Sequence, residues 1–107
     1  LRAFWRLAEA ERAVSAAMQL LADADALILD MRENGGGSAD TVAFLASFVF
    51  DQPGLPLFTV VPRHGEPTSY ATQTVPAANG RRPVYVLTSG RSFSAGEGLP
   101  FLLQVRR

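Results

Sequence analysis

The sequence has no cysteine and no lysine, and only one histidine, among its 107 residues. Without cysteine, disulfides, thiolate chemistry and cysteine-bound zinc are excluded, and no metal or cofactor is expected. All ten basic residues are arginine, so a mechanism that needs a lysine cannot be completed within these residues. No apolar run approaches the ~20 residues of a membrane span, so no such span is expected.

The charges balance, because ten acidic residues offset the ten arginines and the formal net charge is zero. A neutral chain lacks the basic surface that binds nucleic acids or anionic membranes, so neither is an expected partner. The hydrophobic content of 48% argues against disorder. The length allows one domain, over residues 1–107.

The hydrophobic pattern predicts helices that alternate with strands. Apolar residues spaced three and four apart predict a helix over residues 9–22, a second helix begins near the cap residue Ser38, and a third begins near Ser94. Strands are expected over residues 26–31, 57–61, 68–75 and 83–88.

Two of these strands, residues 26–31 and 83–88, are continuously apolar, which is typical of parallel strands covered on both faces. The order of elements predicts the α/β class, with helices flanking a mostly parallel sheet. Proline and glycine between residues 62 and 67 indicate a loop or a hairpin connection.

The first of two candidate functional loops, residues 30–38, follows a predicted strand and contains three consecutive glycines. In α/β sheets, ligands bind at the edge where the carboxyl ends of the strands lie. Glycine there allows backbone N–H groups to turn toward an anionic group. The same residues also fit a flexible tight turn. They lack the lysine and the spacing of a phosphate-binding loop.

The second loop, residues 88–97, places Ser94 at the start of the last helix. The helix dipole and the free N–H groups of a helix start can stabilise an alkoxide and a developing oxyanion, which suits a nucleophile. Ser94 and Glu97 also form the Ser-x-x-Glu pattern of a capping box. Spacing alone leaves both interpretations open.

Taken in order, the segments Asp30–Gly37 and Pro83–Glu97 resemble the C-terminal processing (tail-specific) serine peptidases. The resemblance is strongest to the branch with interphotoreceptor retinoid-binding-protein-like and tricorn-core-like domains, and weakest between Pro53 and Arg82. It implies a crotonase-like or Clp-protease-like layered fold and polypeptide substrates cleaved near their C-termini. It also implies a periplasmic or extracellular location.

The resemblance also implies roles for single residues. Ser94 corresponds to the nucleophile, and Glu97 to the acidic residue that orients the base or the helix start. The backbone N–H groups of Gly36 and Ala95 correspond to the oxyanion hole. The residues expected to shape the first loop are Asp30, Arg32, Asn34, Gly35 and Gly37.

The sequence departs from this family in lacking a general base for the serine. The base of related peptidases is a downstream lysine or an upstream histidine, and neither has a counterpart in residues 1–107. His64 lies in a loop and is expected to be exposed. Pro100 is expected to kink the last helix or delay its start.

We therefore expect a fragment of a catalytic domain that is weakly active or inactive alone. We expect it to associate with a second copy of itself or with missing segments of the domain. Two alternatives stay open at this point. One is a non-catalytic module that binds an apolar ligand such as a retinoid or a fatty acid. The other is a degenerate remnant that only folds or assembles.

Overall fold

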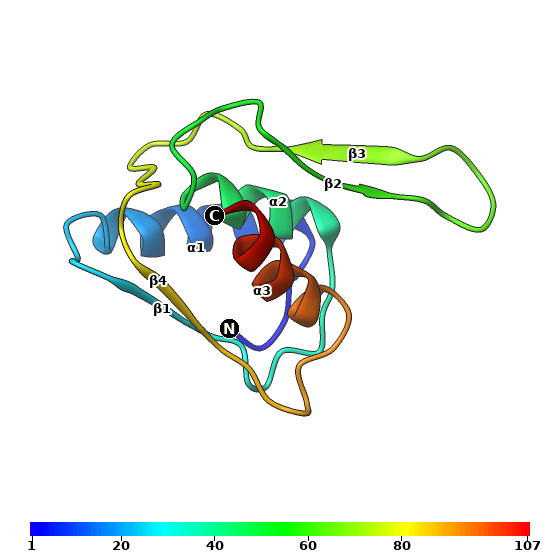
Figure 1. Cartoon of the computed structure of the whole chain (residues 1–107), viewed down its shortest axis with the longest axis horizontal. Coiled ribbons are helices and arrows are strands. Elements are labelled where there is room, and N and C mark those ends of the chain that lie inside the picture. Colours follow the sequence, from blue (N-terminus) through cyan, green and yellow to red (C-terminus); the bar gives the residue numbers. More distant parts are fainter.

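The computed structural model describes all 107 residues and has a mixed α/β architecture, which confirms the predicted class (Figure 1). Its helices are α1 (Leu7–Leu20), α2 (Ala39–Ser47) and α3 (Ala95–Arg106). Its strands are β1 (Leu27–Asp30), β2 (Pro56–Val60), β3 (Thr68–Ala71) and β4 (Val84–Leu87). No helix combines the length and the apolar character that crossing a membrane requires.

The strands form two separate sheets of two strands each. β1 and β4 pair in parallel, from Leu27 opposite Val84 to Asp30 opposite Leu87. β2 and β3 pair antiparallel and form a hairpin that projects beyond the helices (Figure 1). The predicted parallel sheet is present as the small β1–β4 pair, while the hairpin, one of the two connections indicated between residues 62 and 67, forms a separate antiparallel sheet. A short turn between β2 and β3 forces antiparallel pairing, whereas parallel strands need a longer crossover.

The parallel pair is covered on one face only. Leu27 and Leu29 are buried, but on the opposite face Ile28 and Tyr85 are 64% and 59% exposed. The prediction that both strands are covered on both faces is therefore wrong for these residues. Figure 1 shows why, because the helices lie between the parallel pair and the hairpin and leave the outer face of the pair open.

Helix α2 lies at the centre of the core. Every residue from Thr41 to Phe50 is buried, as its nearly continuous apolar sequence predicts. The Phe44 and Phe48 rings pack edge to face, with centroids 5.3 Å apart. The predicted start is confirmed, since the Ser38 side chain accepts a hydrogen bond from the Thr41 N–H.

Helix α1 begins two residues earlier than predicted, and its apolar stripe is narrower in the structure. Met18 is buried and Val14 half-buried, while Ala13 and Ala17 are exposed. The helix packs against α2, so only the side chains that face α2 are buried.

Helix α3 begins at Ala95 and continues through Pro100, so the predicted delay of its start is wrong. A proline within a helix removes only its own N–H from the ladder, which leaves the carbonyl of Gly96 without its helical partner. The remaining turns pack Leu99, Leu102 and Leu103 into the core. Ser94 is thereby held directly at a helix start.

Candidate active site

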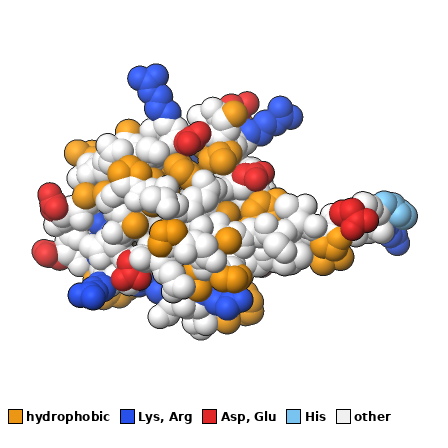
Figure 2. Space-filling view, turned by 90° about the horizontal axis from the view of Figure 1, so that it is seen from above, with side chains coloured by type: hydrophobic (Ala, Val, Ile, Leu, Met, Phe, Trp, Pro, Cys, Tyr) orange, Lys and Arg blue, Asp and Glu red, His pale blue; other side chains and the backbone are white.

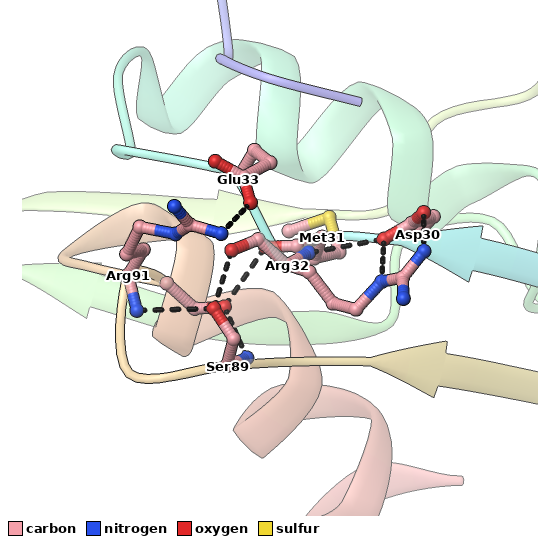
Figure 3. Close-up of polar contacts among 7 residues, drawn as sticks. Asp30, Met31, Arg32, Glu33, Ser89 and Arg91 are labelled. Carbon is pink, nitrogen blue, oxygen red and sulfur yellow. Dashed lines mark hydrogen bonds and ion pairs between the residues drawn. The ribbon is translucent and has the colours of Figure 1, made fainter.

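The two glycine- and serine-containing loops predicted from sequence lie side by side. Phe93 donates its backbone N–H to the Asn34 carbonyl at 3.0 Å, and the Ser92 hydroxyl donates to the Met31 carbonyl at 2.8 Å. Arg91 forms an ion pair with Glu33 (Figure 3). These contacts bring together two segments that are about sixty residues apart in sequence, as the parallel pairing of β1 and β4 requires.

Asp30 and Arg32 form a two-pronged ion pair at the end of β1 (Figure 3). Arg32 Nε donates to Asp30 Oδ1 at 3.0 Å, and Arg32 Nη2 donates to Oδ2 at 2.8 Å. These bonds and the Arg32 backbone N–H hold the pKa of Asp30 well below its ordinary value. The carboxylate therefore stays ionised. Its hydrogen bond from the Arg32 backbone N–H turns the chain at the end of β1.

Asn34 is completely buried and stabilises the glycine loop from inside. Its Oδ1 accepts a hydrogen bond from the Gly36 N–H at 2.8 Å, and its Nδ2 donates to the Leu1 carbonyl at 3.2 Å. The Gly36 N–H, predicted as an oxyanion donor, therefore already has an acceptor within the loop.

Gly36 and Gly37 both have positive φ angles, of 98° and 134°. A Cβ on Gly36 would lie 3.0 Å from the Ser94 Cβ and 3.2 Å from the Ala95 nitrogen. A Cβ on Gly37 would lie 2.0 Å from the carbonyl oxygen of Phe4. Only glycine allows this backbone and this close approach, so the first loop lies directly against the helix start that carries Ser94.

The segment before α1 supports the glycine loop, a role that the sequence did not reveal. Phe4 is buried and donates its N–H to the Gly36 carbonyl at 2.8 Å, while its own carbonyl accepts from the Ser38 N–H at 2.8 Å. An aromatic residue ahead of the helix was the available signal, because a buried ring anchors its backbone.

Ser94 is exposed and has a strained backbone, with φ 54° and ψ −120°. Residues with a side chain rarely occupy this region, and such outliers cluster at active sites. The capping-box arrangement is present, and Glu97 Oε2 accepts from the Ser94 N–H at 2.9 Å. The Ser94 hydroxyl donates no hydrogen bond, so its proton can pass to a base.

A cleft of about 630 Å³ opens beside Ser94, between α3, β2 and the start of α2. Gly37 and Ala95 line it together with Ser94, and neither of their backbone N–H groups has an acceptor. Most of the remaining wall is apolar. It is formed by Ala39, Val42, Leu57, Phe58, Val60, Gly98, Phe101, Leu102, Val105 and Arg106.

No histidine or acidic side chain lines this cleft, and its one charged residue is Arg106. His64 is exposed, as predicted, in the turn between β2 and β3. Figure 2 shows the only histidine of the chain in pale blue at the end of a projecting arm, away from the body of the molecule. No three histidine or acidic side chains gather where they could hold a metal ion.

Comparison with known proteins agrees with this geometry at the level of the family. A search of curated proteins finds no match to the chain. The model of peptidase family S41 matches residues 1–107, which is the whole of the sequence. The matched residues include both loops and the start of α3, which lines the cleft. The chain therefore belongs to peptidase family S41, a family of hydrolases that act on polypeptides.

Proposed function

We propose that this chain carries the nucleophile and the oxyanion donors of a serine endopeptidase that cleaves polypeptides near their C-termini. The observation that carries the proposal is the position of Ser94. Its hydroxyl donates no hydrogen bond, its backbone is strained, and it lies in an apolar cleft beside two free N–H groups. A binding or scaffolding role would not require this combination.

In the proposed reaction, the Ser94 oxygen attacks the scissile carbonyl carbon and the hydroxyl proton passes to a general base. The tetrahedral intermediate carries its negative charge on the former carbonyl oxygen. The amine then leaves with a proton, and an ester remains on Ser94. Water hydrolyses this ester, which releases the carboxylic acid and restores the hydroxyl.

The proposed oxyanion donors are the N–H groups of Ala95 and Gly37. Ala95 follows from the sequence resemblance and opens α3, where the positive end of the helix dipole adds to the stabilisation. Gly37 replaces Gly36, because the Gly36 N–H donates to Asn34 and Gly36 does not line the cleft. Glu97 acts as a positioning residue by holding the Ser94 backbone.

We propose that the general base comes from outside these 107 residues. The chain has no lysine, and its only histidine lies at the exposed turn of the hairpin. A further segment of the protein or a second chain must then bring the base to Ser94, and the isolated chain is weakly active or inactive.

The remaining proposals rest on the sequence resemblance. They are the retinoid-binding-protein-like and tricorn-like branch, a crotonase-like layering, and a periplasmic or extracellular location. The open face of the parallel pair, with Ile28 and Tyr85 exposed, supports an added layer, because parallel sheets are normally covered on both faces.

A fluorophosphonate probe tests the nucleophile, since it forms a covalent bond with activated serines. We expect the protein that includes the proposed base-carrying segment to be labelled and its Ser94→Ala variant to remain unlabelled. Ser69→Ala, an exposed serine on the hairpin, is the matched control and should be labelled like the natural protein. Labelling of Ser94→Ala, or of neither protein, contradicts the assignment.

The alternative of a module for retinoid or fatty acid gains no support from the family match. A fluorescence titration with retinol distinguishes it from the peptidase. Saturable retinol binding by a protein that neither cleaves peptides nor reacts with the probe would favour the module.

A further inference from the structure

The peptide group between Gly36 and Gly37 has a defined orientation in the first loop. Its carbonyl, on Gly36, accepts a hydrogen bond from the Phe4 N–H at 2.8 Å. Every peptide group of the chain is trans, so the carbonyl and the N–H of this group point in opposite directions. The Gly37 N–H therefore points away from Phe4. Gly36 is buried, whereas Gly37 is exposed and lines the cleft.

Glycine on both sides of this peptide group makes its orientation easy to reverse. A half-turn of the group changes only the ψ angle of Gly36 and the φ angle of Gly37, which would leave 134° for a negative value that glycine accepts freely. The reversed group would direct the Gly36 carbonyl oxygen toward the cleft, where it would repel an oxyanion. Asn34 fixes only the preceding peptide group, through the Gly36 N–H. A contact from outside the loop must therefore hold the productive orientation.

Phe4 supplies this contact from the segment before α1. Its N–H binds the Gly36 carbonyl, and its own carbonyl accepts from the Ser38 N–H at 2.8 Å. Phe4 is 2% exposed and belongs to the main hydrophobic core. It is the only buried residue of the segment 1–6, whose other aromatic residue, Trp5, is exposed. The Phe4 ring therefore anchors the backbone that holds the peptide group.

We infer that Phe4 is a positioning residue, which fixes the Gly36–Gly37 peptide group so that the Gly37 N–H faces the oxyanion. The buried ring holds the Phe4 backbone, and the Phe4 N–H holds the Gly36 carbonyl. The rigid peptide group then directs the Gly37 N–H. Phe4 itself does not line the cleft. The inference rests on the proposed function, since Gly37 is one of the two proposed oxyanion donors.

Amide hydrogen exchange, followed by NMR in the full protein, tests the orientation without any reaction. We expect the Phe4 N–H to be protected, because it is buried and hydrogen-bonded. The protection factor of the Gly37 N–H should be at least about tenfold lower, because this group has no acceptor and faces the open cleft. Fast exchange at Phe4, or equal protection of the two amides, overturns the inference.

The rate of fluorophosphonate labelling tests the catalytic consequence, in the protein that includes the base-carrying segment. A phosphonyl oxygen takes the place of the oxyanion, so the donors act on the rate constant of the covalent step, kinact. We expect Phe4→Ala to lower kinact at least about tenfold, toward the ~10²-fold loss that follows removal of one oxyanion donor. The half-saturating probe concentration, KI, should stay unchanged. Phe4→Leu keeps a buried apolar side chain and should recover most of the rate.

Two controls separate positioning from a general loss of stability. Trp5→Ala removes the neighbouring aromatic side chain, which is 67% exposed, and should keep kinact. Met18→Ala removes a buried side chain of α1, and should lower stability but keep kinact. An unchanged kinact in Phe4→Ala overturns the inference, as does an equal loss in Met18→Ala.

The two experiments distinguish failure of this inference from failure of the proposed function. No labelling of the unsubstituted protein, together with the expected exchange pattern, would refute Ser94 as the nucleophile and leave the orientation of the peptide group in place. Labelling that is equally fast in the unsubstituted protein and in Phe4→Ala would retain the nucleophile and refute the role of Phe4.

Discussion

Ser94 combines two features at the scale of a single residue, a hydroxyl that donates no hydrogen bond and a backbone in a sparsely populated region. Such a conformation costs about 1–3 kcal/mol for a residue with a side chain, and surrounding contacts must hold it. Here Glu97 holds the N–H, and the Ser94 carbonyl accepts from the N–H groups of Glu97 and Gly98 at 2.9 Å each. These contacts keep Ser94 at the edge of the cleft that it lines.

Replacement of Ser94 by glycine tests this strain. We expect Ser94→Gly to raise the free energy of unfolding by about 1 kcal/mol relative to Ser94→Ala, because glycine accepts positive φ without cost. Urea denaturation of the two variants measures the difference. Both variants lack the nucleophile, so the comparison isolates the backbone. Equal stability of the two would show that the Ser94 backbone is not strained.

At the scale of an element, helix α3 both lines the cleft and packs into the core. Its buried face carries Leu99, Leu102 and Leu103, while a glycine occupies position 98 on the cleft face, one turn after Ser94. A Cβ at Gly98 would meet nothing within 4 Å, so packing does not require glycine there. The missing side chain instead widens the cleft beside the proposed nucleophile.

Gly98→Ala should therefore change the stability of the protein and its binding of peptides in opposite directions. Alanine stabilises a helix interior by about 0.5–1 kcal/mol relative to glycine, so the free energy of unfolding should rise. The added methyl group narrows the cleft, so a fluorescent apolar peptide should bind more weakly. Denaturation and fluorescence anisotropy measure the two effects. A variant that is more stable and binds peptides unchanged would show that the cleft beside Ser94 is not the peptide site.

Arg107 connects distant parts of the fold, at the scale of the whole molecule. Its guanidinium joins the end of α3 to the Val49 carbonyl after α2 and to Gly80 before β4. Burial lowers its pKa, and the charge of nearby Arg82 lowers it further. The backbone carbonyls that surround the guanidinium offset the cost of placing two cations close together.

Removal of this connection should destabilise the protein without altering the site. We expect Arg107→Ala to lower the free energy of unfolding by about 1 kcal/mol, since it removes hydrogen bonds to a charged and partly exposed group. The control is Arg106→Ala, which removes a free guanidinium and should change stability little. Thermal or urea unfolding compares them. An equal loss in both variants would contradict the structural role of Arg107.

Local sequence predicted the elements well because their signals are local. The caps at Ser38 and Ser94 and the apolar runs at β1 and α2 depend on neighbours in sequence. The open face of the parallel pair could not be predicted, because Ile28 has the same hydrophobicity as a buried strand residue. The separation of the strands into two sheets also depends on which segments pair across space.

The sequence by itself determined the serine at a helix start, the glycine loop at a strand end, and the absence of a lysine that could serve as base. Only the tertiary structure decided how these parts face one another. It brought Gly36 against Ser94, directed the Gly36 N–H to Asn34, left the N–H groups of Gly37 and Ala95 free, and opened the cleft beside Ser94. The reason is physical, since the walls of the cleft and the contact between the two loops come from residues that are distant in sequence and meet only when the core packs.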